Sequence, residues 1–114
     1  MGTEDVHGRA ADLLLAIETE MRQARLWSDL APTPEALASE VPFARDVMDL
    51  TGWLQFVLIP RMAAIIEHGA PLPEASAIRP LAEVEFAGRG VDGLVALLGE
   101  FDALLAGPVG ERRS

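Results

Sequence analysis

Cysteine, lysine and tyrosine are all absent from this chain of 114 residues. The absence of cysteine excludes disulfides, thiolate catalysis and cysteine-ligated metals. Without lysine, the nine basic residues are all arginines, and they face 18 carboxylates, which gives a formal net charge of -9. The sequence shows no basic patch, because Arg9, Arg22 and Arg25 alternate with acidic residues in one predicted helix and Arg112-Arg113 lie in the expected tail. An acidic surface repels phosphate backbones, so we expect no direct binding of nucleic acid.

Motifs for catalysis and cofactor binding are also missing. No serine lies in a nucleophile-elbow sequence, and neither histidine has the spacing of a helical zinc motif. We therefore expect a non-catalytic protein without a cofactor. The N-terminus lacks the apolar segment of a secretory signal, and Gln55 and Arg61 interrupt the apolar run 53–62. That run is too short and too polar to cross a bilayer, so we expect a cytoplasmic protein that does not contact membranes.

Half of the residues are hydrophobic, which is enough to build one folded core in a chain of this length. Apolar residues recur at steps of three and four residues in two segments, 4–26 and 91–105, which is typical of amphipathic helices. Short helices are predicted over 34–39 and 80–86, and a longer one over 49–67. We expect one helical domain, 1–106, followed by a disordered tail, 107–114.

These elements predict an all-α fold, a compact up-down bundle of three long and two short helices. Proline-rich segments connect the helices. Residues 68–77, which include Pro71, Leu72 and Pro73, are predicted to be an extended connector because neither proline fits an ordinary helix. Such connectors are expected to pack on the helices and to form part of the core or of a binding surface.

The predicted helix 49–67 contains apolar residues that point in every direction around its axis. This pattern predicts a central helix that other parts of the protein cover on most sides. Pro60 lies within it, where a proline removes a backbone donor and kinks the helix. The kink leaves a carbonyl that needs a donor, which Arg61, Gln55, a water molecule or a ligand could supply.

Two polar residues flank this proline. Gln55 could satisfy the interrupted helix or could face a pocket. Arg61 lies on the same helical face as several apolar residues, so we expect it to pair with a carboxylate, because an unpaired buried charge is costly. The candidate partners are Asp46, Asp49, Glu83 and Asp102.

The two tryptophans have different surroundings in the sequence. Trp53 has apolar neighbours and is expected to pack in the core. Trp27 follows the first helix beside a polar turn, where a half-exposed indole could anchor a contact with a partner.

The longest of several unusual segments is Trp53-Leu54-Gln55 continuing through Leu58-Ile59-Pro60-Arg61-Met62. The others are Trp27, Pro42-Phe43 with Asp46 and Met48, Pro71-Leu72-Pro73 and Pro80. Together these segments resemble the YqcC-like family of small bacterial proteins, and the resemblance implies a small helical bundle. Because members are often encoded beside the C-type tRNA pseudouridine synthase, it also implies an accessory partner of that enzyme. It supplies no catalytic residue.

Three functions are compatible with these observations. The first is a protein-binding accessory module, with a tRNA pseudouridine synthase as one candidate partner, whose basic surface would complement the acidic one here. The second is a small-molecule or anion site at the kinked helix, formed by Gln55 and Arg61. The third is a self-associating structural protein, a homodimer that buries the helix around Trp53. The candidate binding residues are Trp27, Trp53, Gln55, Pro60, Arg61, Pro71, Leu72 and Pro73.

Overall fold

A computed structural model describes residues 6–107, and within that range the protein is helical, with no strand. The α-helices are α1 (Val6–Gln23), α2 (Pro34–Leu37), α3 (Leu50–Trp53), α4 (Ile59–His68), α5 (Ile78–Glu85) and α6 (Asp92–Ala106). A 3₁₀ turn, Pro42–Ala44, precedes α3, and a π-helical segment, Leu54–Leu58, joins α3 to α4. These two helices and the π segment form one continuous helix, Leu50–His68, which we call the middle helix.

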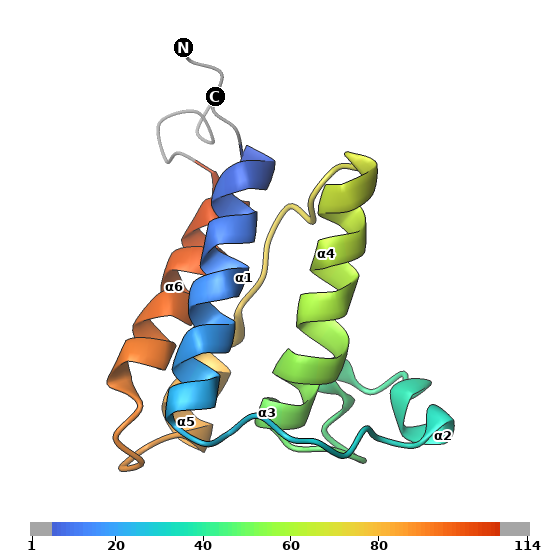
Figure 1. Cartoon of the computed structure of the whole chain (residues 1–114), viewed down its shortest axis with the longest axis vertical. Helices are drawn as coiled ribbons and strands as arrows, with labels where there is room; N and C mark the ends of the chain where they lie inside the picture. Colours follow the sequence, from blue (N-terminus) through green and yellow to red (C-terminus); the bar gives the residue numbers. More distant parts are fainter. Residues whose placement is uncertain (1–5, 108–114) are drawn as a thin grey trace.

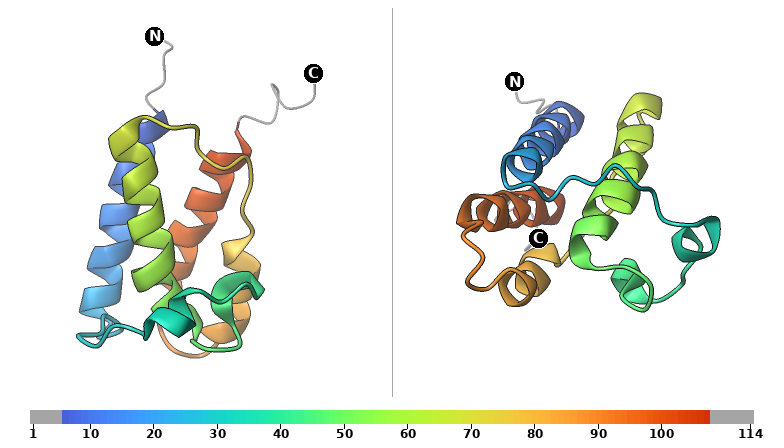
Figure 2. Two further views of the ribbon diagram at one scale, coloured as in Figure 1. Left: turned by 90° about the vertical axis from the view of Figure 1, so that its right-hand side faces the viewer. Right: turned by 60° about the horizontal axis from the view of Figure 1, so that its bottom comes forward.

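The predicted set of three long and two short helices is therefore confirmed for the described residues. α1 descends in Figure 1, and the middle helix and α6 both ascend, so α1 is antiparallel to each of its two long neighbours. The connector after α4 runs back across the bundle to α5, as predicted (Figures 1 and 2). From residue 108 onward the expected tail lies outside the described residues.

Two stripes of apolar side chains form most of the core. They lie on α1 and α6, and each steps by four, three and four residues, which keeps its members on one face of the helix. The stripes are Ala10, Leu14, Ile17 and Met21 on α1, and Leu94, Leu98, Phe101 and Leu105 on α6. α1 and α5 both pack against α6, whereas the middle helix packs against α1.

The middle helix is less covered than the sequence predicts. Its buried side chains form one stripe, Leu50, Leu54, Gln55, Leu58 and Met62. Only 28% of its 18-residue apolar window is buried inside the structure. The prediction of a helix covered on most sides holds for residues 50–59, which are all buried or half-buried. It is wrong for residues 60–68, where six of the nine are exposed because the bundle does not close around this part of the helix.

The same helix corrects the length argument made from the run 53–62. The middle helix has 19 residues and contains an 18-residue window with a mean hydropathy of 1.2, which makes it long and apolar enough to cross a membrane by length and composition. It exceeds the apolar run because Leu50 begins the helix earlier and Ala63 to Ile66 extend its apolar surface.

Two helix ends show what the sequence signals and what it hides. Gly69 ends α4 in the left-handed region at φ 64°, and the Ala70 N–H donates to the Ile65 carbonyl, as the glycine predicts. α1 ends in the same way but at Arg25, which has φ 64°. The Leu26 N–H donates to the Met21 carbonyl there. The predicted end near residue 26 is therefore three residues late, because no glycine marks the turn.

The start of α5 depends on a side chain from another helix. The Asp102 carboxylate on α6 accepts hydrogen bonds from the N–H groups of Ile78 (3.1 Å) and Arg79 (2.8 Å), and from the Ser76 hydroxyl. These bonds satisfy donors that the first turn of a helix leaves free. α5 consequently begins at Ile78, two residues before Pro80, where the sequence places its start.

Candidate functional site

The chain around Pro60 remains one helix, because a π-helical turn accommodates the proline. The Ile59 N–H donates to the Leu54 carbonyl, five residues back, instead of to Gln55. Such a turn widens the helix just where proline lacks an N–H and crowds the preceding turn. The prediction of a single helix through Pro60 is confirmed. Pro60 itself is exposed on the outer face.

Gln55 uses its amide in a way that neither sequence alternative anticipates. Its Nε2 donates to the Ser28 carbonyl at 2.8 Å, and its Oε1 accepts from the Ser28 N–H at 2.8 Å. The side chain is only 7% exposed and is the one buried polar residue among those described. Gln55 therefore ties the segment after α1 to the middle helix. Both ends of the amide are engaged with Ser28. The predictions that Gln55 satisfies the interrupted helix or faces a pocket are therefore wrong.

Arg61 has no ion pair within residues 6–107, and it is exposed. The expectation of a carboxylate partner is wrong, because each candidate acid has another role. Asp46 accepts from Ser39, Asp49 caps α3, Glu83 pairs with Arg79, and Asp102 caps α5. The physical reason is the exposure of this helical face, where water solvates the guanidinium and no pairing is required.

Both tryptophans are half-buried and pack against the core. The Arg22 guanidinium lies 4.5 Å from the Trp27 ring centroid, so a cation covers part of the indole that the sequence predicts as a contact anchor. Phe43 meets Trp53 edge to face, with centroids 4.9 Å apart. Phe43 adopts φ 59°, a left-handed conformation that is rare for a bulky residue and that tertiary contacts must hold in place.

The proline-rich connector packs on the bundle at one residue and is exposed on either side of it. Leu72 packs against the core, whereas Pro71 and Pro73 are exposed. Leu72 and Pro73 also line an open hollow of about 570 Å³ beside the end of α6. His7 on α1 lies 2.7 Å from the Ala70 carbonyl, which fixes the start of the connector.

An apolar groove separates the outer parts of α1 and the middle helix. We call it the α1–α4 groove, and its volume is about 410 Å³. Its lining residues are Ala11, Leu14, Leu15 and Glu18 of α1, and Ile59, Ala63, Ile66 and Glu67 of α4. Leu15 is 65% exposed, so its side chain is open to solvent at the groove. The groove therefore adds a hollow apolar surface beside the exposed face of the middle helix.

Asp49 caps the middle helix and carries a perturbed pKa. Its Oδ1 accepts from the Gly52 N–H at 3.0 Å and from the Thr51 hydroxyl at 2.8 Å. Partial burial raises the pKa of Asp49, but these hydrogen bonds and the charge of Arg89 outweigh burial, so the pKa lies below its ordinary value.

We predict that Asp49→Ala lowers the free energy of unfolding by about 1 kcal/mol at neutral pH, the usual contribution of such a cap. Because the folded state has the lower pKa, the advantage of Asp49 is complete above the unfolded pKa of about 4. It is lost as the pH falls through the folded pKa. Urea unfolding at neutral pH and at a pH below the folded pKa measures this loss of stability. Asp49→Asn is the control, because asparagine caps the helix but does not titrate. An Asp49→Ala loss of the same size at both pH values would contradict the role of the Asp49 carboxylate as the cap.

The family comparison agrees with this geometry. A family model described as "DUF446: tRNA pseudouridine synthase C" matches residues 9–104. The chain belongs to this family. YqcC of Escherichia coli is 36% identical over 102 residues, which are 88% of this chain and 94% of that protein. The resemblance to YqcC-like proteins that the sequence predicts is therefore confirmed.

A solved structure of this family shares the fold. The solution NMR structure of Escherichia coli YqcC matches with a TM-score of 0.80 and 35% identity, and the match covers 90% of each chain. This match confirms the all-α architecture.

Two further relatives match over shorter stretches. An uncharacterized protein of Haemophilus influenzae is 45% identical over 67 residues, 59% of this chain and 63% of that protein. A tRNA pseudouridine synthase C of Pectobacterium carotovorum is 37% identical over 62 residues, 54% of this chain and 16% of that protein. The matched stretch is therefore a small part of the Pectobacterium protein.

Sequence reasoning missed the α1–α4 groove, although one signal was present. Leu13, Leu14 and Leu15 are consecutive, and a helix with one buried stripe can bury only part of such a triplet. Leu14 enters the core, and Leu15 remains for the groove. Ser28 carried no signal, because its role depends only on the backbone atoms that Gln55 contacts.

Proposed function

We propose that this chain is a non-catalytic accessory module that binds another protein, and that its partner is a tRNA pseudouridine synthase. One observation carries the proposal. Leu15 of α1 is 65% exposed and lines the apolar α1–α4 groove with Ile59 and Ile66 of the middle helix, whose second half is mostly exposed. Apolar surfaces left open in this way mark interaction sites. The partner would cover the outer face of the middle helix and the α1–α4 groove.

The comparisons support the choice of partner. The matching family carries the description tRNA pseudouridine synthase C. In the Pectobacterium protein of that name, the matched stretch is 16% of the length, so a region similar to this chain shares one polypeptide with a much larger remainder. A covalent link raises the effective concentration of one domain near the other. Two separate chains that act together need a binding surface to stay close to each other.

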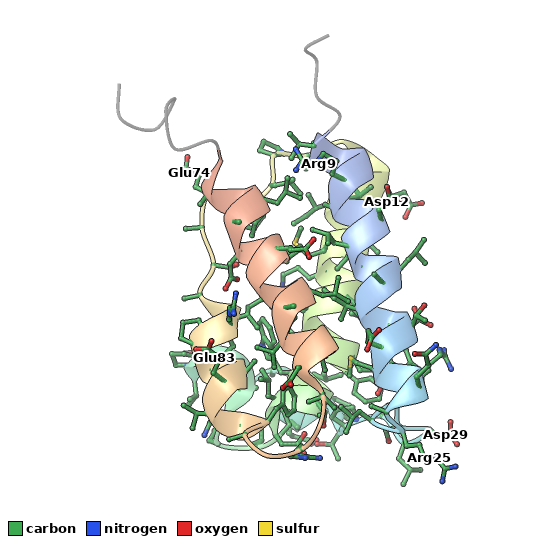
Figure 3. All side chains as sticks on the ribbon, turned by 90° about the vertical axis from the view of Figure 1, so that its left-hand side faces the viewer. Arg9, Asp12, Arg25, Asp29, Glu74 and Glu83 are labelled. Carbon is green, nitrogen blue, oxygen red and sulfur yellow. The ribbon has the colours of Figure 1, made fainter. Side chains whose placement is uncertain are left out.

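Charge also favours a protein partner over direct contact with tRNA. Among the described residues, Arg22, Arg45 and Arg79 each pair with a glutamate, at 2.8, 2.6 and 3.1 Å. Arg9 lines a hollow with Asp12 and Glu100. Figure 3 likewise shows Arg25 and Asp29 at the same end of the molecule. With a net charge of -9, the module complements an enzyme that carries basic residues for tRNA phosphates, and we place both proteins in the cytoplasm.

The test is formation of a complex between the full chain and the tRNA pseudouridine synthase of the same organism. We expect the two proteins to elute together in size-exclusion chromatography. Leu15→Glu places a charge in the groove and should weaken the complex at least tenfold, the scale of a central interface contact. Val84→Glu is the matched control, because Val84 is 74% exposed on α5 and does not line the groove. Separate elution of the unmodified proteins at micromolar concentrations would overturn the proposal.

A further inference from the structure

The walls of the α1–α4 groove have the spacing of a helix-docking surface. On α1 the lining positions step from Ala11 to Leu15 to Glu18, and on α4 they step from Ile59 to Ala63 to Ile66. These steps of four and three residues produce two ridges about two helical turns long. Ridges with this spacing accept the side chains of a third helix between them.

Small residues in both walls leave room for a close approach. Ala11 and Ala63 lie in opposite walls, and Ala63 is exposed. Large apolar side chains, Leu15 and Ile59, flank these alanines. The groove therefore has the alternation of small and large positions into which the apolar residues of an amphipathic helix insert.

The polar residues of the groove are both carboxylates. Glu18 lies on α1 and bonds Arg22 at 2.8 Å, while its side chain remains 31% exposed. Glu67 lies on α4, is exposed, and has no ion pair among residues 6–107. An occupant that carries Lys or Arg beside its apolar stripe would pair with these carboxylates, which sets the sign of charge that the groove selects.

The same carboxylates disfavour the other occupants. A second copy of the chain would bring one acidic surface, with a charge of -9, against another. Anionic lipid headgroups would be repelled in the same way. Residues 1–5 and 108–114, which lie outside the described range, contain only Met1 and Val109 as large apolar residues, so they cannot supply an apolar stripe.

We infer that the α1–α4 groove binds one amphipathic helix of the partner protein, with apolar residues at positions i, i+4 and i+7 and basic residues on the flanks of this stripe. The inference rests on the proposed function and deepens it by naming the recognition element. The helix would lie between α1 and α4 and complete a layer that the bundle leaves open.

The experiment uses the full, ¹⁵N-labelled chain and a synthetic helical peptide of three heptads, with leucine and alanine in its stripe and lysine on both flanks. A scrambled peptide of the same composition is the control. We expect amide shifts along α1 and α4 on titration with the helical peptide only. Leu15→Glu should weaken this binding at least tenfold, while Val84→Glu should leave it unchanged.

A charge exchange tests the selectivity of the groove. Glu67→Lys should weaken binding of the lysine peptide and strengthen binding of a peptide with glutamate on its flanks. Equal binding of the scrambled and helical peptides, shifts confined to other elements, or no binding would each overturn the inference. So would sedimentation as a dimer that Leu15→Glu dissociates, because a second copy would then occupy the groove.

The two proposals fail separately. If the synthase elutes with the chain but Leu15→Glu leaves that complex intact, the helix-docking inference is wrong and the accessory function stands. If the peptide binds the groove but the synthase does not form a complex, the groove accepts helices and the synthase is not the partner.

Discussion

Gln55→Glu is expected to lower the free energy of unfolding by about 3 kcal/mol at neutral pH, because it buries a charge and leaves one of the two carboxylate oxygens without a donor. In the native protein Nε2 donates to the Ser28 carbonyl. A carboxylate oxygen at that position would face the carbonyl oxygen, lone pair against lone pair. The side chain is 7% exposed, so water compensates little. Urea unfolding followed by circular dichroism measures the loss.

The pH dependence of this variant separates charge from shape. Burial raises the pKa of the new carboxyl above its unfolded value of about 4.3. The folded state then holds the carboxyl proton more tightly than the unfolded state does. The stability of Gln55→Glu relative to the native protein therefore falls as the pH rises from the unfolded pKa to the folded pKa. Below it, the protonated acid can donate to Ser28, and much of the loss should disappear. Gln55→Met, which cannot titrate, should lose about 2 kcal/mol at every pH. A Gln55→Glu loss that does not change with pH would contradict the buried contact.

Asp102→Ala is expected to lower the free energy of unfolding by about 2 kcal/mol, because it removes the acceptor for two backbone N–H groups and a hydroxyl at the start of α5. In this variant, amide hydrogen exchange should accelerate more in α5 than in α1, because the cap acts locally. Glu100→Ala, at an exposed position on the same helix, is the control. Equal stability of the two alanine variants would show that the cap contributes nothing.

Periodicity predicts the long helices well, because a stripe such as Leu94, Leu98, Phe101 and Leu105 records which face is buried. It predicts ends well only where the stopping residue is special. Gly69 announces the end of α4, but Arg25 adopts the same left-handed conformation without any signal. The start of α5 was missed for another reason. Its cap comes from Asp102, which follows it by more than twenty residues, and local patterns do not contain such pairings.

The candidate site shows a similar division. The sequence singles out Gln55, Pro60 and Arg61 correctly as unusual, because polar residues and proline in an apolar helix need a physical reason. It assigns Arg61 to a buried pair because it treats the whole middle helix as buried. Composition alone does not separate a helix covered on most sides from one that leaves a face for a partner. The packing of α1 against one side of the middle helix determines which of its faces stays open, and that packing depends on contacts between residues far apart in the sequence.

The central claim, that this module works through a protein and not through RNA, is tested most directly by fluorescence anisotropy of the labelled full chain at physiological salt. We predict that the anisotropy rises on titration with the tRNA pseudouridine synthase and stays flat on titration with tRNA, because a body of charge -9 gains nothing from counterion release on phosphates. A rise with tRNA that disappears at higher salt, together with no response to the synthase, would contradict the account.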